Sequence, residues 1–141
     1  MNWEDLTDST IEHILPQNPD ENSNWLSKWK DEERAKYLHD ISNLILTKDN
    51  SRYSNFEFDR KSKGLNDKGD KFYEFYYANS DIKQERKISQ DFEDWTPQNC
   101  IKRRVELTDW IIKNWGIDRH FQQPIEEIID EDEDIIFNDV D

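Results

Sequence analysis

The stretch Ile-Glu-His-Ile-Leu-Pro-Gln at residues 11–17 decides the fold, together with Ser-Asn-Leu-Ile-Leu-Thr-Lys-Asp-Asn at residues 42–50. Residues 10–15 form a short, partly β-branched segment that ends at a proline, which predicts a strand. A second strand is predicted at residues 44–47. A polar helix follows and ends before Gly64, a residue type favoured at helix C-termini. The sequence therefore predicts two short strands followed by a helix.

Further helices are predicted from cap residues and from apolar side chains repeated at helical spacing. The expected helices are a turn that carries Trp25 and Trp29, residues 31–39, residues 49 or 50 to 63, residues 70–78 and residues 97–115. The tryptophans expected in the hydrophobic core are Trp25, Trp29, Trp95, Trp110 and Trp115. We therefore expect an α+β fold, with two short strands among several helices.

Charge divides the chain into a predicted domain and a predicted tail. The 141 residues carry 33 acidic and 19 basic side chains, for a net charge of −14. Nine of these acids and none of the bases fall in residues 125–141, which leaves 24 acids against 19 bases over residues 1–124. A block of like charge repels itself and stays extended. We expect a domain over residues 1–124 and a flexible acidic tail, which either solubilises the chain or docks on a basic partner.

Composition excludes several classes of protein. The 13% of aromatic residues argues against a disordered chain. The longest apolar run is far shorter than the roughly 20 residues that cross a bilayer, so no membrane association is expected. The single cysteine, Cys100, allows neither an internal disulfide nor a cysteine-rich structural zinc site. We expect a cytoplasmic, reducing setting.

The candidate chemistry lies at the ends of the predicted strands. His13 ends the first strand with Glu12 beside it, Asn43 opens the second strand, and Asn50 opens the helix that follows. A neutral imidazole can accept a proton from water near pH 7. The oxygen atoms of Glu12 and Asn50 suit a hard ion such as Mg²⁺, which can offset negative charge on a phosphate. These residue types in this order favour phosphodiester hydrolysis.

Each of these residues also has an ordinary structural interpretation. A histidine beside an acid is often a hydrogen-bonded structural residue. Asn50 can simply cap a helix, and Asn43 can satisfy backbone groups in a turn. His39 is expected to decorate a helix end and is not counted as catalytic. The basic run at residues 102–104 is more typical of a solvated helix face than of a phosphate clamp.

The segments at residues 11–17 and 42–50, with Ser-Asn-Phe at residues 54–56 and Lys61, resemble the HNH (His-Me finger, ββα-metal) endonucleases. More narrowly, they are similar to the C-terminal nuclease domain of GmrSD-type, modification-dependent restriction enzymes. The similarity extends over roughly residues 6–117. It implies a ββα-metal core, in which two antiparallel strands and a helix surround one metal ion.

The resemblance also implies a role for each matching residue. His13 corresponds to the general base, and Asn43 to the residue that braces the loop and helps to orient this base. Glu12 and Asn50 correspond to the ligands of one divalent cation, with Mg²⁺ expected and Mn²⁺ as a substitute. The expected contacts to duplex DNA are Lys48, Arg52, Asn55, Lys61 and Arg104.

Two departures from the family pattern qualify these expectations. Ser42 stands where the family usually has glycine. The nucleotide-dependent sensor domain of GmrSD-type proteins is not seen, so a separate or missing sensor is expected.

The leading hypothesis is a metal-dependent DNA endonuclease that acts in restriction and phage defence. The alternatives are an acidic DNA mimic or inhibitor, favoured by the net charge of −14, and a catalytically silent assembly module.

Overall fold

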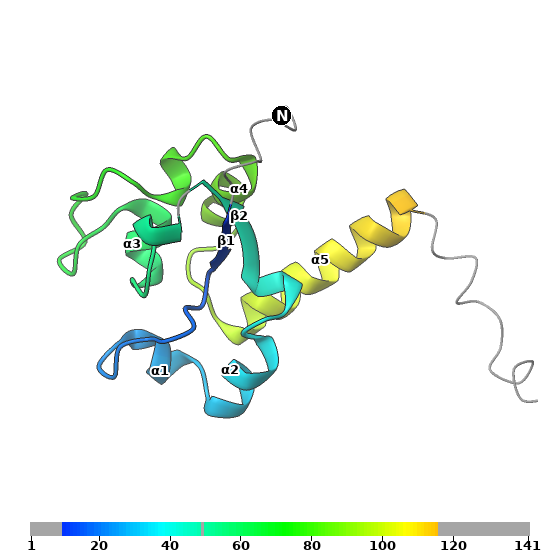
Figure 1. Ribbon diagram of the computed structural model, residues 1–141, viewed down its shortest axis with the longest axis horizontal. Coiled ribbons are helices and arrows are strands. Elements are labelled where there is room, and N and C mark those ends of the chain that lie inside the picture. The colour runs from blue at the N-terminus through cyan, green and yellow to red at the C-terminus, as the bar shows by residue number, and fades with distance from the viewer. Residues whose placement is uncertain (1–9, 49, 116–141) are drawn as a thin grey trace, which may run out of the picture. The chain divides into compact units, whose positions relative to one another are not determined.

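The computed structural model describes residues 10–48 and 50–115 of the chain. Its elements are β1 (Thr10–His13), α1 (Asn24–Lys28), α2 (Asp31–Tyr37), η2 (Ile41–Asn43), β2 (Leu44–Thr47), η3 (Asn50–Arg52), α3 (Phe58–Lys63), η4 (Tyr77–Asn79), α4 (Lys83–Asp91) and α5 (Pro97–Trp115), where η denotes a 3₁₀ turn (Figure 1). This mixture of strands and helices confirms the expected α+β class. No helix in the described ranges has both the length and the apolar character of a membrane span.

The chain divides into two units, residues 1–105 and residues 106–141, and each is described by itself. The described part of the second unit is the C-terminal portion of α5, which includes Trp110 and Trp115. The side chains of these two residues are 57% and 72% exposed, so the prediction that they belong to the core is wrong. The acidic tail predicted at residues 125–141 lies outside the described residues, as does the boundary predicted after residue 124.

The strands β1 and β2 form an antiparallel pair (Figure 1). In this pair Glu12 lies opposite Ile45 and His13 lies opposite Leu44. Successive side chains of a strand point to opposite faces, and here Glu12 and Ile45 are buried while Ile11 is exposed. The strand β1 ends at His13, two residues earlier than predicted. The sheet therefore buries Glu12 and leaves His13 at the strand end, only partly covered.

The helix expected between residue 49 or 50 and residue 63 is divided into η3 and α3. The break contains Ser54, whose φ of 41° lies in the left-handed region that an α-helix cannot include. The helix α3 then ends at Gly64, which has a φ of 72° and provides the left-handed C-cap that the sequence predicted. The division leaves Asn50 on a short turn of its own rather than at the start of a long helix.

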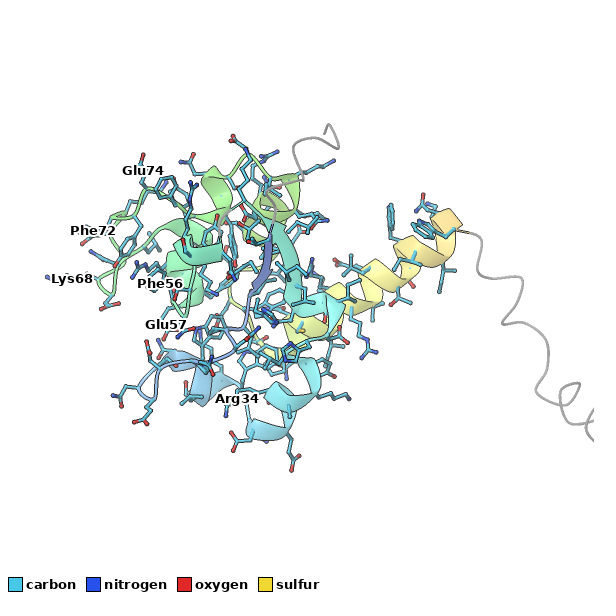
Figure 2. All side chains as sticks on the ribbon, in the orientation of Figure 1. Arg34, Phe56, Glu57, Lys68, Phe72 and Glu74 are labelled. Carbon is cyan, nitrogen blue, oxygen red and sulfur yellow. The ribbon has the colours of Figure 1, made fainter. Side chains whose placement is uncertain are left out.

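The helix predicted at residues 70–78 is wrong, because no α-helix forms in that described segment. The carbonyl oxygen of Gly64 accepts hydrogen bonds from the backbone nitrogens of Phe72 and Tyr73, at 3.0 and 3.1 Å, which draws the chain back onto the end of α3. Lys68, Phe72 and Glu74 lie at the periphery of the loop that results (Figure 2). The helix α4, which was not predicted, follows this loop.

The hydrophobic core of the first unit collects large side chains from almost every element. Trp25, Trp29 and Trp95 are fully buried in it, as predicted. Each indole N–H of the first two finds a carbonyl oxygen, since Trp25 donates to Phe56 at 3.2 Å and Trp29 donates to Trp95 at 2.9 Å. The other members are Ile14, Leu15, Tyr37, Ile45, Tyr53, Phe58, Tyr77, Ile88, Phe92 and Cys100. This core supports the sheet from the side on which Glu12 is buried.

Candidate active site

The end of β1 and the turn η3 contribute residues to one pocket of about 290 Å³. Its lining residues are Glu12, His13, Pro16, Gln17, Asn18, Asn50, Ser51, Ser54 and Asn55. The candidate base and both candidate metal ligands named from the sequence therefore face the same space. Asn43, Lys48, Arg52, Lys61 and Arg104 do not line this pocket.

A second histidine, His39, which was expected only to decorate a helix end, contacts the first. Nε2 of His13 lies 3.1 Å from Nδ1 of His39, and the two rings meet edge to face at 84°. The amide nitrogen of Gln17 lies 3.2 Å from each ring nitrogen of His13. His39 follows α2 and is 26 residues from His13, so no local pattern could have paired them. This contact gives the imidazole of His13 a hydrogen-bond partner that can fix its tautomer.

The surroundings of His13 favour its neutral form. Partial burial lowers the pKa of His13, and the nearby His39 and Lys61 lower it further because they disfavour another positive charge. An imidazole with a lowered pKa keeps a lone pair at neutral pH. His13 is therefore suited to accept a proton from water.

Beneath His13 lies a buried ion pair. Nζ of Lys61 is 2.6 Å from Oε1 of Glu12 and also donates to the carbonyl oxygens of His13 at 2.9 Å and Ile14 at 3.2 Å. These three acceptors match the three protons of an ammonium group, so we assign a charged lysine opposite an ionised Glu12. Burial still raises the pKa of Glu12 and lowers that of Lys61, since it disfavours both charges.

This position corrects the expectation that Lys61 contacts DNA. Its side chain is 0% exposed, and its ammonium group is engaged by Glu12 and by the backbone at the end of β1. The ε-amino group therefore fastens α3 to the strand that carries His13. Sequence spacing could not reveal this role, because Lys61 is 49 residues away from Glu12.

Asn43 is fully buried and braces the segments on either side of the histidine pair. Its Oδ1 accepts hydrogen bonds from the backbone nitrogen of Leu15 at 2.8 Å and from the indole of Trp95 at 3.0 Å. Its Nδ2 donates to the carbonyl oxygens of Leu15 at 3.1 Å and Leu38 at 2.9 Å. These bonds hold the residues that follow His13 and precede His39. Asn43 thus acts on the site indirectly, by holding the backbone next to the two histidines.

A buried arginine supports the turn before β2. Arg103 was expected within a solvated basic run, but it is buried and donates to the carbonyl oxygens of Ser42 and Leu44. Asp40 accepts from the backbone and hydroxyl of Ser42 at 2.9 and 2.6 Å, which caps the same turn without the family's glycine. Arg103 and Asp40 therefore fix the backbone from which Asn43 extends.

The remaining candidate DNA contacts lie outside the core. Lys48 pairs with Asp81 at 3.4 Å, and the guanidinium of Arg52 lies 4.1 Å from the ring of Phe75. Arg104 lies 3.6 Å from Asp40. Asn55 lines the His13 pocket itself. All four remain candidates for contact with a phosphate backbone.

The oxygen donors of the pocket fit a hard cation. No group of three or more His, Cys, Asp or Glu side chains that could hold a metal occurs in the described part of the chain. Both hydrogen bonds that Glu12 accepts there end on Oε1, which leaves Oε2 as the carboxylate oxygen available to a ligand. Asn50 and Asn55 add amide oxygens. Mg²⁺ commonly takes one or two protein carboxylates and completes its shell with water and phosphate oxygens, which matches this set.

Comparison with known proteins identifies a family for this chain. No curated protein and no solved structure matches the chain. The family described as GmrSD restriction endonucleases, C-terminal domain, matches residues 2–110, a range that includes every residue of the pocket. Its members are nuclease domains of restriction enzymes, whose substrate is DNA. The chain belongs to the family of GmrSD restriction endonuclease C-terminal domains.

Proposed function

We propose that this domain is a metal-dependent DNA endonuclease of the HNH type, in which His13 is the general base. The observation that carries the proposal is the common pocket of Glu12, His13 and Asn50, which brings a neutral imidazole beside oxygen donors for a cation. The substrate is duplex DNA, and the biological role is restriction of modified phage DNA in concert with a nucleotide-dependent sensor.

The tautomer of the histidine pair determines which nitrogen of His13 acts as the base. When Nε2–H of His13 donates to Nδ1 of His39, the lone pair of His13 lies on Nδ1. Nδ1 then accepts the proton from the attacking water, which displaces the amide group of Gln17 from its contact with the ring. His39 is thus a positioning residue, and Asn43 and Lys61 hold the backbone on which the imidazole depends.

Glu12 and Asn50, which line the same pocket as His13, would hold the divalent cation. When bound, this cation offsets the negative charge that develops on the phosphate and on the leaving oxygen. One such site cuts one strand, so a single domain is expected to nick DNA rather than break both strands together.

Plasmid nicking by the purified chain tests this proposal. The parent should convert supercoiled plasmid to open circles with Mg²⁺ or Mn²⁺ and should be inactive with a chelator. His13→Ala should reduce the rate by about 10²- to 10⁴-fold, the usual contribution of a general base. Asn50→Ala should raise the Mg²⁺ concentration needed for half-maximal rate.

The control is Gln84→Ala, an exposed position on α4 that lines none of the described pockets. This variant should nick at the parental rate, and circular dichroism should show that all three variants are folded. If folded His13→Ala nicks as fast as the parent, His13 is not the base and the proposed mechanism is wrong.

A further inference from the structure

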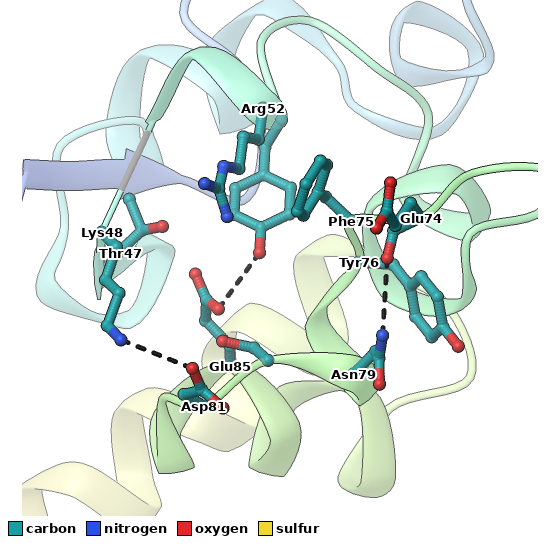
Figure 3. A pocket seen from close by; sticks show the side chains of 11 residues that line it. Thr47, Lys48, Arg52, Glu74, Phe75, Tyr76, Asn79, Asp81 and Glu85 are labelled. Atoms are coloured by element: carbon teal, nitrogen blue, oxygen red, sulfur yellow. Dashed lines mark hydrogen bonds and ion pairs between the residues drawn. The ribbon is translucent and has the colours of Figure 1, made fainter.

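A second pocket lies on the other side of the η3 turn from the His13 site. It has a volume of about 170 Å³ and is lined by Thr47, Lys48, Arg52, Tyr53, Glu74, Phe75, Tyr76, Asn79, Ser80, Asp81 and Glu85 (Figure 3). Drug-sized ligands occupy pockets of about 300–1,000 Å³, so this one suits a single small group. None of its lining residues is shared with the pocket of His13.

The wall of this pocket contains a buried carboxylate with an unused acceptor. Glu85 is 1% exposed, and its Oε2 accepts a hydrogen bond from the hydroxyl of Tyr53 at 3.1 Å. Its Oε1 is buried and has no hydrogen-bond partner. Figure 3 shows the Glu85 carboxylate between Lys48 and Arg52, with its second oxygen directed toward the Arg52 side. Because buried polar atoms are nearly always paired, this oxygen indicates a ligand that brings an N–H or O–H donor.

The other walls suit a flat ring that carries acceptors. Phe75 is 50% exposed, and the guanidinium of Arg52 lies 4.1 Å from the centre of its ring. Aromatic rings and guanidinium planes are the surfaces on which unstacked bases pack. Lys48, which pairs with Asp81 across the rim, places a second cationic group beside the pocket. Arginine and lysine are the usual partners of O6 and N7 of guanine.

We propose that this pocket binds one unpaired base of the DNA substrate, and that guanine is the base it fits best. The N1–H and exocyclic N2–H of guanine form two adjacent donors, which match the carboxylate of Glu85. Its O6 and N7 acceptors face Arg52 and Lys48. Cytosine and adenine offer an amino group but no second adjacent donor, and thymine offers a single N–H.

The position of the pocket connects it to the proposed nuclease reaction, on which this inference rests. Residues 50–53 run between the two pockets, since Asn50 and Ser51 line that of His13 while Arg52 and Tyr53 line that of Glu85. The two pockets therefore flank the same short segment of the chain, which begins with the turn η3. A strand held at His13 can therefore place a neighbouring base against Glu85.

Two nucleotides that differ by one amino group test the inference. Deoxyguanosine monophosphate and deoxyinosine monophosphate are titrated into the full chain without metal, and binding is followed by calorimetry and by amide chemical shifts. We expect the guanine nucleotide to bind at least about 10-fold more tightly and to shift amides in residues 48–53 and 75–85. Both ligands carry the same phosphate, so nonspecific attraction to Lys48 and Arg52 cancels in the comparison.

The variant Glu85→Gln should remove this preference, because an amide cannot offer two acceptor oxygens. The matched control Glu32→Gln changes an exposed acid on α2 and should leave the preference intact. Equal affinity of the two nucleotides for the parent chain, or no binding of either, would overturn the inference, whether or not Glu85→Gln folds.

A third variant separates this inference from the nuclease proposal. His13→Ala should abolish nicking but bind deoxyguanosine monophosphate as the parent does. If the chain nicks DNA but shows no preference for guanine, the base-pocket inference is wrong and the nuclease proposal stands. If the chain prefers guanine but never nicks DNA, the nuclease proposal is wrong and the pocket stands as a base-binding site.

Discussion

Replacement of Lys61 by methionine should destabilise the domain by about 3–5 kcal/mol, the usual effect of removing one partner from a buried ion pair. Methionine fills much of the same space but carries no charge and donates no hydrogen bond. The carboxylate of Glu12, only 2% exposed, would keep the hydroxyl of Tyr77 as its donor and lose its cation. The carbonyl oxygens of His13 and Ile14 would also lose the bonds that Lys61 donates.

Urea denaturation followed by tryptophan fluorescence measures this loss, because Trp25, Trp29 and Trp95 are all buried. A loss of 1 kcal/mol lowers the melting temperature of a small domain by about 4–8 °C, so the variant should melt more than about 10 °C below the parent. The control Lys83→Met, at the exposed start of α4, should change stability by less than about 0.5 kcal/mol.

The double variant Glu12→Leu with Lys61→Met distinguishes a charge effect from a packing effect. Removing both charges together is often neutral or stabilising, so the double variant should be more stable than Lys61→Met alone. The ion-pair assignment fails if Lys61→Met costs less than about 1 kcal/mol or if the double variant regains nothing.

Two further predictions concern the base and the end of α3. Because burial and His39 lower the pKa of His13, nicking should persist as the pH falls below about 6.5, and His39→Ala should move the acidic limb of the pH–rate profile upward. A lower rate with an unmoved limb would contradict this role. Gly64→Ala should cost about 2 kcal/mol or more in urea unfolding, since φ is +72° and a Cβ would lie 2.6 Å from Cδ1 of Tyr76. The control Gly69→Ala has a φ of +82°, but the added Cβ would meet no neighbouring side chain or backbone atom within 4 Å, so it should cost only about 1 kcal/mol. Equal losses of stability in the two variants would refute the steric argument.

The elements predicted well are those whose signals are local. The short, partly β-branched segment before Pro16 and the apolar segment at residues 44–47 predicted both strands, and the glycine after α3 predicted the end of that helix. The candidate residues Glu12, His13 and Asn50 converge because they lie at junctions of this short antiparallel pair. The pairing of the two strands thus brings together residues that are far apart in the sequence.

The predictions that failed depended on contacts between distant residues. The aromatic segment at residues 70–78 has residues that suit a helix, but bonds to the carbonyl oxygen of Gly64 hold it in a loop. A lysine is normally exposed, and only the placement of Glu12 and two carbonyl groups makes the interior favourable for Lys61. The role of His39 was likewise missed, because its contact with His13 depends on how the segment that follows α2 packs in the fold.

The two pockets are joined by a buried network in which charge is unevenly compensated. The hydroxyl of Tyr77 donates to Glu12, that of Tyr53 donates to Glu85, and the two tyrosine rings meet edge to face at 4.7 Å. Burial and the adjacent carboxylates raise the pKa of both tyrosines, so both stay protonated and serve as donors. Among the described residues, only Glu12 of the two acids has a cationic partner within ion-pair distance. A buried acceptor without a donor opposes folding, so the unpaired Oε1 of Glu85 is better explained by a ligand that donates hydrogen bonds than by a contribution to stability.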